Sequence, residues 1–582
     1  MTSVSDFIVK YLEDYGIKHV FMIVGGGSMF LNNSFRKSKK IKTVFQHHEQ
    51  ACAIAAEGYS RVTGNLSVVN VTTGPGGTNT ITGVLGQWTD SVPVLYISGQ
   101  VKFETSIKSC KDIFLRQLGD QEASIIDIVS PITKYATIIT DPYVIKYELE
   151  KAIHIATSGR PGPAWIDIPL NIQNAIIDEN NLRGYNYFDI VKNSLFNDYF
   201  DFKNILLKYK RPLLIAGNGI RIGKAKDEFF ELINKLNIPV VTTFNGFDLI
   251  PSDHPNFIGR IGTIGTRAGN FALQNADLII SFGSRNNIRQ ISYDWNSFAK
   301  NAYKIIVDID SEELKKPTVK PDIGICDDVK NFIKTCLNEL SFEIPSYAEW
   351  LVQCQNWKKL YPVVLEEYKK NRDVNPYYFM NILTECLHEG DIVVAGNGTA
   401  CVTLFQAGNV KHNQRIFWNS GCASMGYDLP ASIGACFASN KQVVCIAGDG
   451  SIMMNLQELQ TISHYNLPIK IFILNNGGYK SIMQTQENYF SGNFFGCNPQ
   501  SGITFPDFEK VAYAFNLKYE YVSYTYYVKE CIEDILSKSG PTICEVYLDP
   551  KYIFQPKLLS KKLPDGTIVS PSLENMFPFL NE

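Results

Sequence analysis

The sequence lacks any strong excess of charge of one sign and any long apolar run. Over 582 residues, 55 basic and 58 acidic side chains give a formal net charge of -3. Neither sign is gathered into the kind of tail that binds nucleic acid, so we expect no nucleic-acid partner. No stretch offers roughly 18 uncharged apolar residues in a row, which argues against a membrane span.

Targeting, disulfide and metal motifs are missing as well. Residues 1–20 have no basic start, unbroken apolar run or small-residue cleavage site, and they predict an amphipathic helix in a cytoplasmic protein. The thirteen cysteines are odd in number and include no C-x-x-C pair. The eight histidines show no H-x-x-x-H spacing. We therefore expect reduced, packed thiols and no transition-metal site built by the protein.

What the sequence does contain is material for several packed domains. Hydrophobic residues make up 45% and charged residues 19%, which is typical of globular proteins, and the length favours three or four domains. Apolar, β-branched runs alternate with helical patterns, which predicts an α/β fold class with three doubly wound parallel-sheet domains. We expect these domains at residues 1–175, 195–340 and 370–549, followed by a C-terminal tail, 550–582. The first and third regions are similar in style without a repeat of individual residues, and a polar, aromatic linker is expected near 180–200.

Two polar clusters in the third region follow successive strands. The Gly-Asp-Gly turn at 448–450 comes after one apolar strand, and an Asn-Asn pair at 475–476 ends the next, with one helix and one returning strand expected between them. Both clusters then meet at the carboxyl edge of a sheet, where phosphates bind. Mg²⁺ prefers oxygen ligands, and Asp449, Asn476 and Gly478 would supply a carboxylate, an amide and a main-chain carbonyl. Gly-Asp-Gly alone is more often a simple turn, but the pair resembles the diphosphate motif of thiamine-diphosphate enzymes.

A second, independent motif lies at residues 46–64. Residues 51–58 are mostly Ala and Gly, which predicts a helix packed closely against another backbone, with Glu49 near its buried start. Thiamine chemistry needs a carboxylic acid at the pyrimidine N1′, and a partly desolvated glutamate suits that role. Taken alone, Glu49 would be an ordinary residue at a helix start. Together with Asp449 and Asn476, it predicts the catalytic acid.

Further contacts follow from the same resemblance. Met425 would support the bent cofactor from below, with a buried core methionine as the alternative, and the Ala423 carbonyl would accept from the 4′-amino group. The complete set of cofactor-binding residues that the resemblance implies is Gly74, Asn79, Gly398, Thr399, Ala423, Met425, Gly448, Asp449, Gly450, Ser451, Asn476, Gly478 and Tyr479.

The motifs, in this order, cover nearly the whole chain and are similar to the acetolactate synthase branch of the family. The resemblance implies pyrimidine-binding, central and diphosphate-binding domains. It also implies a homo-oligomer, dimer or tetramer, with the cofactor between Glu49 of one chain and Asp449 of another.

The resemblance implies FAD in the central domain. Residues 216–224 follow a predicted strand and have the Gly217, Gly219, Gly223 spacing of a dinucleotide turn; a P-loop fails by one residue and lacks the final Ser or Thr. Departures from the family pattern are Asn287, in place of Asp, and Thr263-Ile264, in place of Met-His. The implied FAD-binding residues are Gly217, Gly219, Thr242, Gly283, Arg285, Arg289 and Asp310.

The acceptor side departs further from the branch. Gln121 matches the active-site Gln, but Asp120 stands where a Phe is usual and Thr485 where a Trp is usual, which predicts a roomier and more polar pocket. The predicted reaction is decarboxylation of pyruvate or a similar 2-keto acid, with transfer of the acyl carbanion to a carbonyl acceptor.

Three alternatives remain open. The acceptor could be a nucleotide-linked keto sugar, as in relatives that make branched sugars. The enzyme could be a non-ligating decarboxylase, in which His47 or His48 contacts the substrate instead of merely packing. A module that has lost catalysis is disfavoured because Glu49, Asp449 and Asn476 are all present.

Overall fold

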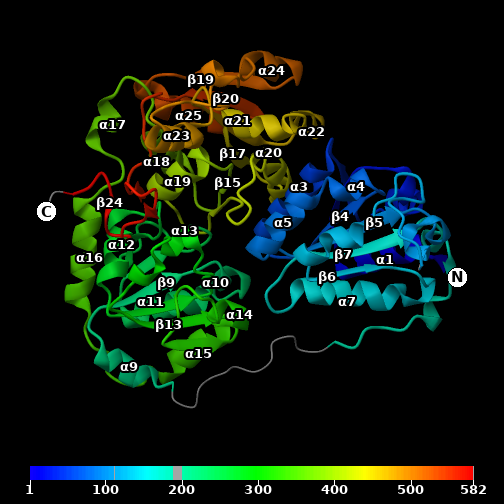
Figure 1. Cartoon of the computed structure of the whole chain (residues 1–582), viewed down its shortest axis with the longest axis horizontal. Helices are drawn as coiled ribbons and strands as arrows, with labels where there is room; N and C mark the ends of the chain where they lie inside the picture. Colours follow the sequence, from blue (N-terminus) through cyan, green and yellow to red (C-terminus); the bar gives the residue numbers. More distant parts are fainter. Residues whose placement is uncertain (111, 188–199, 581–582) are drawn as a thin grey trace.

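The computed structural model describes residues 1–110, 112–187 and 200–580. Within them, three six-stranded sheets are flanked by helices (Figure 1), and every strand pair in these sheets is parallel. This confirms the α/β class. In the described part of the chain, every helix is too short or too polar to span a bilayer. Most of the predicted linker lies outside the described residues.

The first and third sheets have the same strand order when strands are counted along each region. The first has the order β3-β2-β4-β5-β7-β6 and the third the order β16-β15-β17-β18-β20-β19. The similarity between the two regions is therefore one of architecture. The bounds in the first are β2 (His19–Met22), β3 (Lys42–Phe45), β4 (Ser67–Val71), β5 (Val94–Gln100), β6 (Tyr135–Ile138) and β7 (Ala164–Pro169). Those in the third are β15 (Ile392–Ala395), β16 (Arg415–Phe417), β17 (Val443–Gly448), β18 (Ile469–Asn475), β19 (Lys518–Val522) and β20 (Thr542–Tyr547).

The central sheet has the order β11-β10-β9-β12-β13-β14, which reverses between β9 and β12. Ligands of open α/β sheets bind outside the carboxyl ends of strands at such a switch point. The corresponding points are between β15 and β17 in the third sheet and between β2 and β4 in the first. The central strands are β9 (Pro212–Ala216), β10 (Val240–Thr242), β11 (Phe257–Arg260), β12 (Leu278–Phe282), β13 (Tyr303–Asp308) and β14 (Ile323–Cys326).

The helices cover these sheets with their apolar faces. At the N-terminus, α1 (Val4–Tyr15) starts where the Ser3 side chain accepts from Asp6 N and ends at Gly16, with φ 98°. Its apolar face is buried, as the amphipathic pattern predicts. Other helices are α2 (Met29–Lys37), α5 (Ile81–Asp90), α7 (Ile145–Thr157), α11 (Lys226–Leu236), α12 (Arg267–Asn275), α15 (Val329–Glu339), α16 (Ala348–Leu360), α18 (Pro376–Cys386), α19 (Thr399–Ala407), α23 (Lys480–Phe490), α24 (Phe508–Ala514) and α25 (Val528–Ser537).

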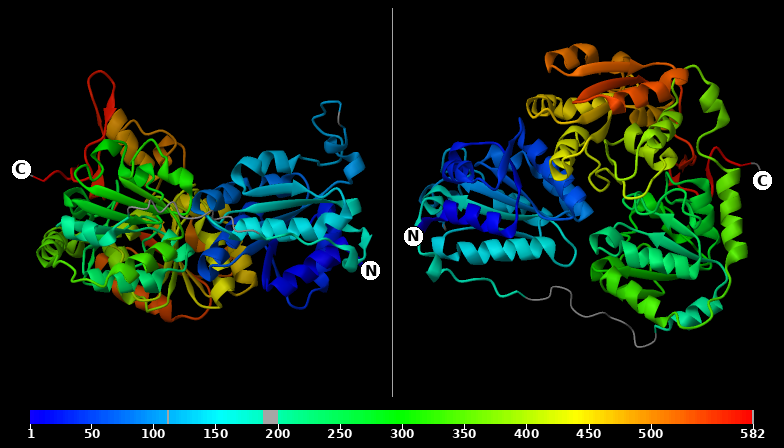
Figure 2. Two further views of the ribbon diagram at one scale, coloured as in Figure 1. Left: turned by 90° about the horizontal axis from the view of Figure 1, so that it is seen from below. Right: turned by 180° about the vertical axis from the view of Figure 1, so that it is seen from behind.

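The first and third domains meet through α3 (Glu49–Thr63) and α20 (Asp428–Ser439), which lie side by side in both whole-chain views (Figures 1 and 2). Glycines bring the two backbones together. A Cβ on Gly58 would lie 2.2 Å from the Ala431 carbonyl oxygen, and one on Gly434 would lie 1.8 Å from the Ala55 carbonyl oxygen. The expectation that this Ala- and Gly-rich helix packs against another backbone is confirmed.

The segment between the two polar clusters differs from the expectation. In place of one helix, the structure has α21 (Asp449–Ile452), a 3₁₀ turn (Met453–Asn455) and α22 (Glu458–His464). The Asn455 side chain donates from the break to the Gly426 carbonyl at 2.7 Å. Asparagine commonly leaves a helix where its side chain makes such bonds.

The C-terminal tail ties the third domain to the central one. Leu573 is fully buried in the central-domain core, and Asn270 Nδ2 donates to its carbonyl at 3.1 Å. Tyr552 and Phe554, at the start of the tail, pack in the core of the third domain. The short pairs β21 (Lys557–Leu558) with β24 (Met576–Phe577), and β22 (Lys561–Lys562) with β23 (Ile568–Val569), complete it. All thirteen cysteines are free in the structure.

Candidate functional site

Asp449 occupies the switch point of the third sheet. It begins α21 directly after β17 and is 2% exposed. Its carboxylate accepts from Asn476 N at 2.8 Å and from Gly478 N at 3.2 Å. Burial raises the pKa of Asp449 to about 6, against the lowering effect of these bonds. The structure thus brings the three predicted magnesium ligands together at the ends of neighbouring strands.

The side-chain and main-chain oxygens at this point fit a hard divalent cation. They are carboxylate, amide and carbonyl oxygens, the ligands that Mg²⁺ takes. In the described ranges there is no group of three or more His, Cys, Asp and Glu side chains able to hold a metal ion.

A tyrosine from the tail holds the predicted amide ligand. Tyr552 OH donates to Asn476 Oδ1 at 2.9 Å and lies 2.7 Å from Thr399 Oγ1. Tyr552 is almost fully buried. No motif pointed to Tyr552, because this residue lies 76 residues beyond Asn476, in a segment with no local sequence signal.

Glycines shape the diphosphate side. Gly398, with φ 78°, precedes α19 and allows the sharp entry to the helix that starts at Thr399. A Cβ on Gly450 would lie 2.2 Å from Tyr479 Cε1, so the Tyr479 ring lies directly on the Gly450 backbone. Gly448 is the residue before α21. The predicted diphosphate residues therefore gather around one sheet edge.

Glu49 is the first residue of α3 and is partly buried. Its Oε2 accepts from Asn79 Nδ2 at 2.9 Å, which brings together two predicted cofactor residues. His48 is the N-cap of α3, and its Nδ1 accepts from Gln50 N at 3.0 Å. His47 is exposed, and its backbone N–H donates to Glu458 Oε1 at 3.0 Å.

A hydrogen-bonded path joins the two halves of the site. Asn455 Nδ2 donates to Gln50 Oε1 at 3.0 Å and to the Gly426 carbonyl at 2.7 Å. Gly426 N in turn donates to Ser451 Oγ at 3.0 Å, and that hydroxyl donates to the buried Asp428 carboxylate at 2.6 Å. The neighbour of Glu49 is thus connected to the α21 turn that begins at Asp449, within one chain.

The loop between the halves presents two further predicted cofactor residues. Met425 is 39% exposed, so the alternative of a buried core methionine is wrong. Ala423 has φ 53°, a left-handed conformation that is uncommon for alanine. The loop thus combines an accessible apolar side chain with a constrained backbone.

The acceptor-side residues are exposed. Gln121 has φ 58°, and a Cβ on Gly74 would lie 2.1 Å from the Gln121 carbonyl oxygen, so these two predicted residues are in contact. Asp120 is exposed beside Gln121. Thr485 is exposed on α23, and its hydroxyl donates to the Ser481 carbonyl one turn earlier at 2.9 Å.

Family models match most of the chain. They are the N-terminal TPP binding domain of thiamine pyrophosphate enzymes over residues 2–123, the central domain over 201–336 and the C-terminal TPP binding domain over 396–546. The chain belongs to the thiamine pyrophosphate enzyme family. Thiamine pyrophosphate is the same compound as thiamine diphosphate, so the cofactor inferred from the two motifs is supported by both binding domains.

Curated relatives match this thiamine pyrophosphate enzyme over about nine tenths of its length. The acetolactate synthase large subunit of Cyanidium caldarium is 31% identical over 558 residues, 92% of each chain. The probable acetolactate synthase large subunit of Methanocaldococcus jannaschii is 31% identical, with 94% of this chain and 92% of the relative covered. The acetolactate synthase large subunit of Lactococcus lactis subsp. lactis is 32% identical, with 89% and 88% covered.

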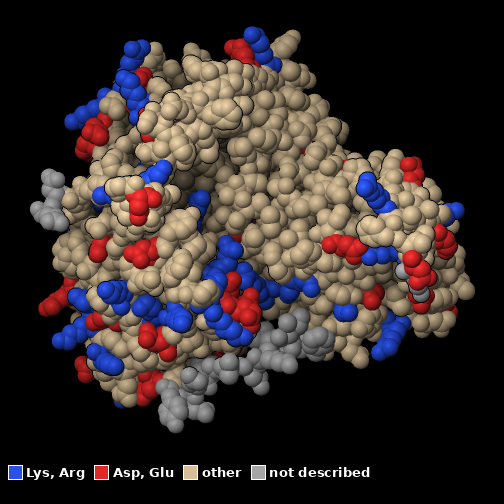
Figure 3. Space-filling view, viewed as in Figure 1, with Lys and Arg blue, Asp and Glu red and all other residues tan. Residues whose placement is uncertain are grey.

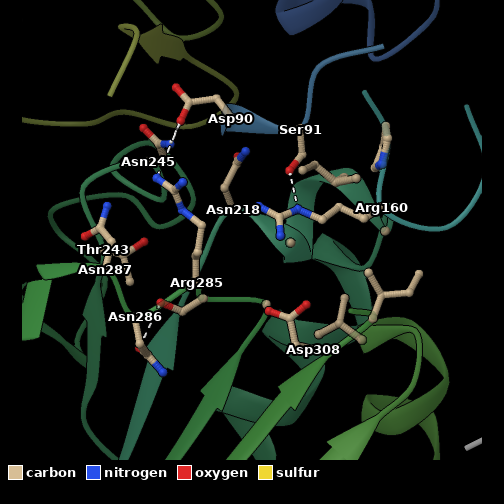
Figure 4. A pocket seen from close by; sticks show the side chains of 18 of the residues that line it. Asp90, Ser91, Arg160, Asn218, Thr243, Asn245, Arg285, Asn286, Asn287 and Asp308 are labelled. Atoms are coloured by element: carbon tan, nitrogen blue, oxygen red, sulfur yellow. Dashed lines mark hydrogen bonds and ion pairs between the residues drawn. The ribbon is translucent and has the colours of Figure 1, made fainter. Parts of the chain in front are cut away.

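A cavity of about 340 Å³ lies at the switch point of the central domain of this thiamine pyrophosphate enzyme (Figure 4). Residues of the first and third domains also line it. Of the seven predicted FAD residues, Gly219, Gly283 and Arg285 line the cavity. Gly283 has φ 54°, and a Cβ on it would lie 2.5 Å from Gly219 Cα, so the two glycines let the turns touch.

The other four predicted FAD residues are not among the lining residues. Asp310 caps the short helix α14 (Ser311–Leu314) and pairs with Arg160 at 3.0 Å. The Arg289 guanidinium lies 4.9 Å from the Phe244 ring centre. Gly217 and Thr242 lie at or near the ends of β9 and β10.

Two residues that line the cavity, Thr243 and Asp308, were not predicted from the sequence. Thr243 lies one position after the predicted Thr242, and Asp308 lies two positions before the predicted Asp310. Burial raises the pKa of Asp308 to about 6. The strand ends, which the pattern locates only to within a few residues, decide which side chain enters the cavity.

Proposed function

We propose that this enzyme decarboxylates pyruvate or a similar 2-keto acid and transfers the acyl group to a carbonyl acceptor. The observation that carries the proposal is the hydrogen-bonded path from Gln50 through Asn455 and Gly426 to Ser451, which joins the Glu49 half of the site to the Asp449 half. The full-length similarity to acetolactate synthase large subunits supports the reaction class.

Each residue has a role that its surroundings support. Asp449, Asn476 and Gly478 would hold Mg²⁺ and, through it, the diphosphate. When bound, thiamine diphosphate supplies the electron sink that permits loss of carbon dioxide from a 2-keto acid. Glu49 would hold a proton at the pyrimidine N1′, and the exposed Met425 side chain would support the bent cofactor.

Replacing Glu49 by Gln tests the proposal. The amide cannot exchange the N1′ proton, so we expect pyruvate consumption to fall by about 100-fold or more, with Asn79 still able to bond the amide oxygen. Glu366→Gln is the matched control, because Glu366 is also a glutamate in the first turn of a helix. Unchanged turnover in Glu49→Gln, with the cofactor bound, would show that the proposed mechanism is wrong.

The acceptor is a separate question. A second candidate function is acetyl transfer to a nucleotide-linked keto sugar, which the exposed Asp120 and Thr485 favour because they leave the acceptor side open. Labelled pyruvate should be offered with 2-keto acids and with nucleotide keto sugars in turn, and the products identified by mass spectrometry. Coupling to a second 2-keto acid only would exclude the keto sugar as acceptor.

The non-ligating alternative finds less support. In this alternative His47 or His48 contacts the substrate, but one ring nitrogen of His48 already accepts from Gln50 N in the cap of α3. Acetaldehyde as the sole product from pyruvate, with every acceptor, would favour simple decarboxylation and contradict the carboligase.

We propose that the central cavity takes FAD, held with its diphosphate near the Gly219 turn. A neighbouring cavity of about 870 Å³ shares Asn218 and Lys224 with the first and is also lined by Arg221. Figure 3 shows basic side chains with acidic ones among them along the seam between the central and first domains. The glycine turn, the basic Lys224 and Arg221 and the shared walls fit an anionic dinucleotide. A colourless, flavin-free protein that is fully active would contradict FAD.

A further inference from the structure

The loop that leads into the proposed cofactor residues is held by a carboxylate from another domain. Ser420 N donates to Asp90 Oδ2 at 2.9 Å, and Gly421 N donates to Asp90 Oδ1 at 3.0 Å. Asp90 is the last residue of α5 in the first domain, whereas the loop follows β16 in the third. Two successive backbone amides are therefore fixed by one side chain across a domain boundary.

The next two amides are held from within the loop. Cys422 N and Ala423 N donate to Asn419 Oδ1 at 3.1 and 3.0 Å. The Asn419 amide group in turn lies within 3.4 Å of Glu57 Oε2 on α3. Together with the two bonds to Asp90, four consecutive N–H groups have fixed acceptors. This accounts for the left-handed backbone at Ala423, because such a conformation persists only where its surroundings determine it.

Asp90 is itself fixed on all sides. Its side chain is fully buried and pairs with Arg61 at 2.7 Å. Asn245 Nδ2, from the central domain, donates to Asp90 Oδ1 at 3.1 Å (Figure 4). Arg61 also pairs with Glu57 at 2.9 Å. One carboxylate thus receives donors from all three domains, and its position cannot drift without breaking several charge-assisted bonds.

Close packing supports the same interpretation. A Cβ on Gly421 would lie 2.3 Å from Thr89 Oγ1 and 2.8 Å from Asp90 Oδ1. The loop backbone is therefore pressed against the end of α5, at a distance that only glycine allows.

We propose that Asp90 is a positioning residue for the proposed thiamine site: it fixes residues 420–423 so that the Ala423 carbonyl and the Met425 side chain are presented to the cofactor. The proposal rests on the proposed function, in which Met425 supports the bent cofactor, and on the predicted role of the Ala423 carbonyl as acceptor from the 4′-amino group. Asp90 acts through the backbone and touches neither substrate nor cofactor.

A purely structural role is the competing explanation, and Asp248 provides the matched control. Its side chain is also fully buried, pairs with Arg415 at 2.7 Å and with Arg221 at 2.8 Å, and accepts from Ile416 N at 2.9 Å. Asp248 joins the central and third domains, whereas Asp90 joins all three. The third-domain partners of Asp248, Arg415 and Ile416, precede the loop at residues 420–423.

Asp90→Asn is the main variant. The amide group of Asn has one oxygen that accepts and one NH₂ group that donates. Arg61 and Ser420 now donate to one oxygen of Asp90, and Asn245 and Gly421 donate to the other. One of these two pairs of donors would therefore face the NH₂ group. In the apoprotein, we expect hydrogen–deuterium exchange of the backbone over residues 420–425 to become at least about 10-fold faster. In the holoenzyme, we expect kcat to fall by about 10- to 100-fold while KM for the keto acid changes by less than about 3-fold.

The control and a second variant keep the proposal falsifiable. Asp248→Asn should lower the melting temperature but leave loop exchange and kcat near wild type. Gly421→Ala, which pushes the loop from the other side, should reproduce the faster exchange and the loss in kcat. The near-ultraviolet circular dichroism of the bound cofactor should change in Asp90→Asn and in Gly421→Ala, but not in Asp248→Asn.

Two results would overturn the proposal: loop exchange and kcat unchanged in Asp90→Asn, or equal changes in Asp90→Asn and Asp248→Asn. Hydrogen–deuterium exchange is measured in the apoprotein, so it reports on the loop independently of catalysis. Its result stays informative even if Glu49→Gln retains activity and the proposed function fails. Failure of the positioning role and failure of the proposed function are therefore distinguishable.

Discussion

At the scale of single residues, buried carboxylates in this protein differ by what surrounds them. Burial raises the pKa of Asp167 to about 7, against hydrogen bonds from Ser98 and Gln100. Burial also tends to raise the pKa of Asp248, but Arg221 and Arg415 hold it below its ordinary value. Equal burial therefore gives opposite shifts, because only Asp248 has cations beside it.

Asp167 makes stability depend on pH. Its folded pKa is raised, so the unfolded state loses the proton first, and the contribution of this group to stability falls as pH rises from about 4 to about 7. Asp167→Asn removes that dependence. The melting temperature of the variant minus that of wild type should therefore rise between pH 5 and pH 7, as calorimetry can measure.

The control for this prediction is Asp248→Asn. Because the pKa of Asp248 is lowered, it is ionised in both folded and unfolded states over this range. Its difference in melting temperature should stay constant between pH 5 and pH 7. A constant difference for Asp167→Asn as well would contradict the raised pKa.

Tyr552→Phe tests the hydroxyl that holds the proposed metal ligand. Without it, Asn476 Oδ1 loses its donor and is no longer oriented, so half-saturation by Mg²⁺ should require about 10-fold more metal. The measurement is a Mg²⁺ titration of thiamine diphosphate binding, followed by protein fluorescence. Tyr377→Phe, which removes another buried hydroxyl of the same domain, is the control. An equal Mg²⁺ requirement in both variants would leave Tyr552 with a packing role only.

At the scale of elements, the short polar motifs could be predicted because each follows its own strand directly. The Gly-Asp-Gly turn and the Asn pair end β17 and the neighbouring β18, so adjacency along a parallel sheet was enough to place them together. The break between α21 and α22 could not be predicted. It depends on Asn455 reaching Gly426 and Gln50, which lie far away in the sequence.

The contact between α3 and α20 gives a prediction at this scale. Gly58→Ala and Gly434→Ala would each drive a methyl group into a backbone carbonyl of the facing helix. Neither backbone can yield easily, so each change should destabilise the protein by roughly 1–3 kcal/mol, seen as a lower melting temperature and weaker cofactor binding.

Gly162→Ala is the matched control for the helix contact. A Cβ there would lie 3.1 Å from the Lys134 side chain and 3.9 Å from the Trp88 ring, with no backbone atom among its nearest neighbours, so stability should change little. If Gly58→Ala were as stable as this control, the close approach of the two helices would be wrong.

At the scale of the whole molecule, charged side chains fasten the three domains together. Asp90 joins all three, and Asp248 joins the central domain to the third through Arg415. The cavity proposed for FAD and the proposed thiamine site both border Asp90 or the loop that it holds. The domains are therefore coupled through groups that are costly to separate once buried.

Whether one site uses one chain or two can be decided by mixing inactive variants. We expect a homo-oligomer in which Glu49 and Asp449 of different chains share a site, as the resemblance to the acetolactate synthase branch implies. Glu49→Gln and Asp449→Asn proteins, mixed and allowed to exchange, should then regain about a quarter of wild-type activity, because half of the dimers are mixed and half of their sites are intact.

A site built from a single chain predicts that the mixture stays inactive. The two halves of the site contact each other within the single chain. If one chain supplies both Glu49 and Asp449 to a site, every site in the mixture contains one of the two substitutions. No activity would then return, and the shared site would be excluded. A mixture of either variant with itself is the baseline.

The sequence by itself determined the α/β class, because strand periodicity depends only on local order. Short motifs that follow strands pointed to the family by resemblance and marked Glu49, Asp449 and Asn476 as the proposed site residues. Tertiary structure decided the rest. Asp90 and Tyr552 act through partners from distant segments, and the choice of Asp308 over Asp310 as a lining residue depends on where β13 ends. Such roles arise only when packing brings separate elements together, and no spacing along the chain encodes them.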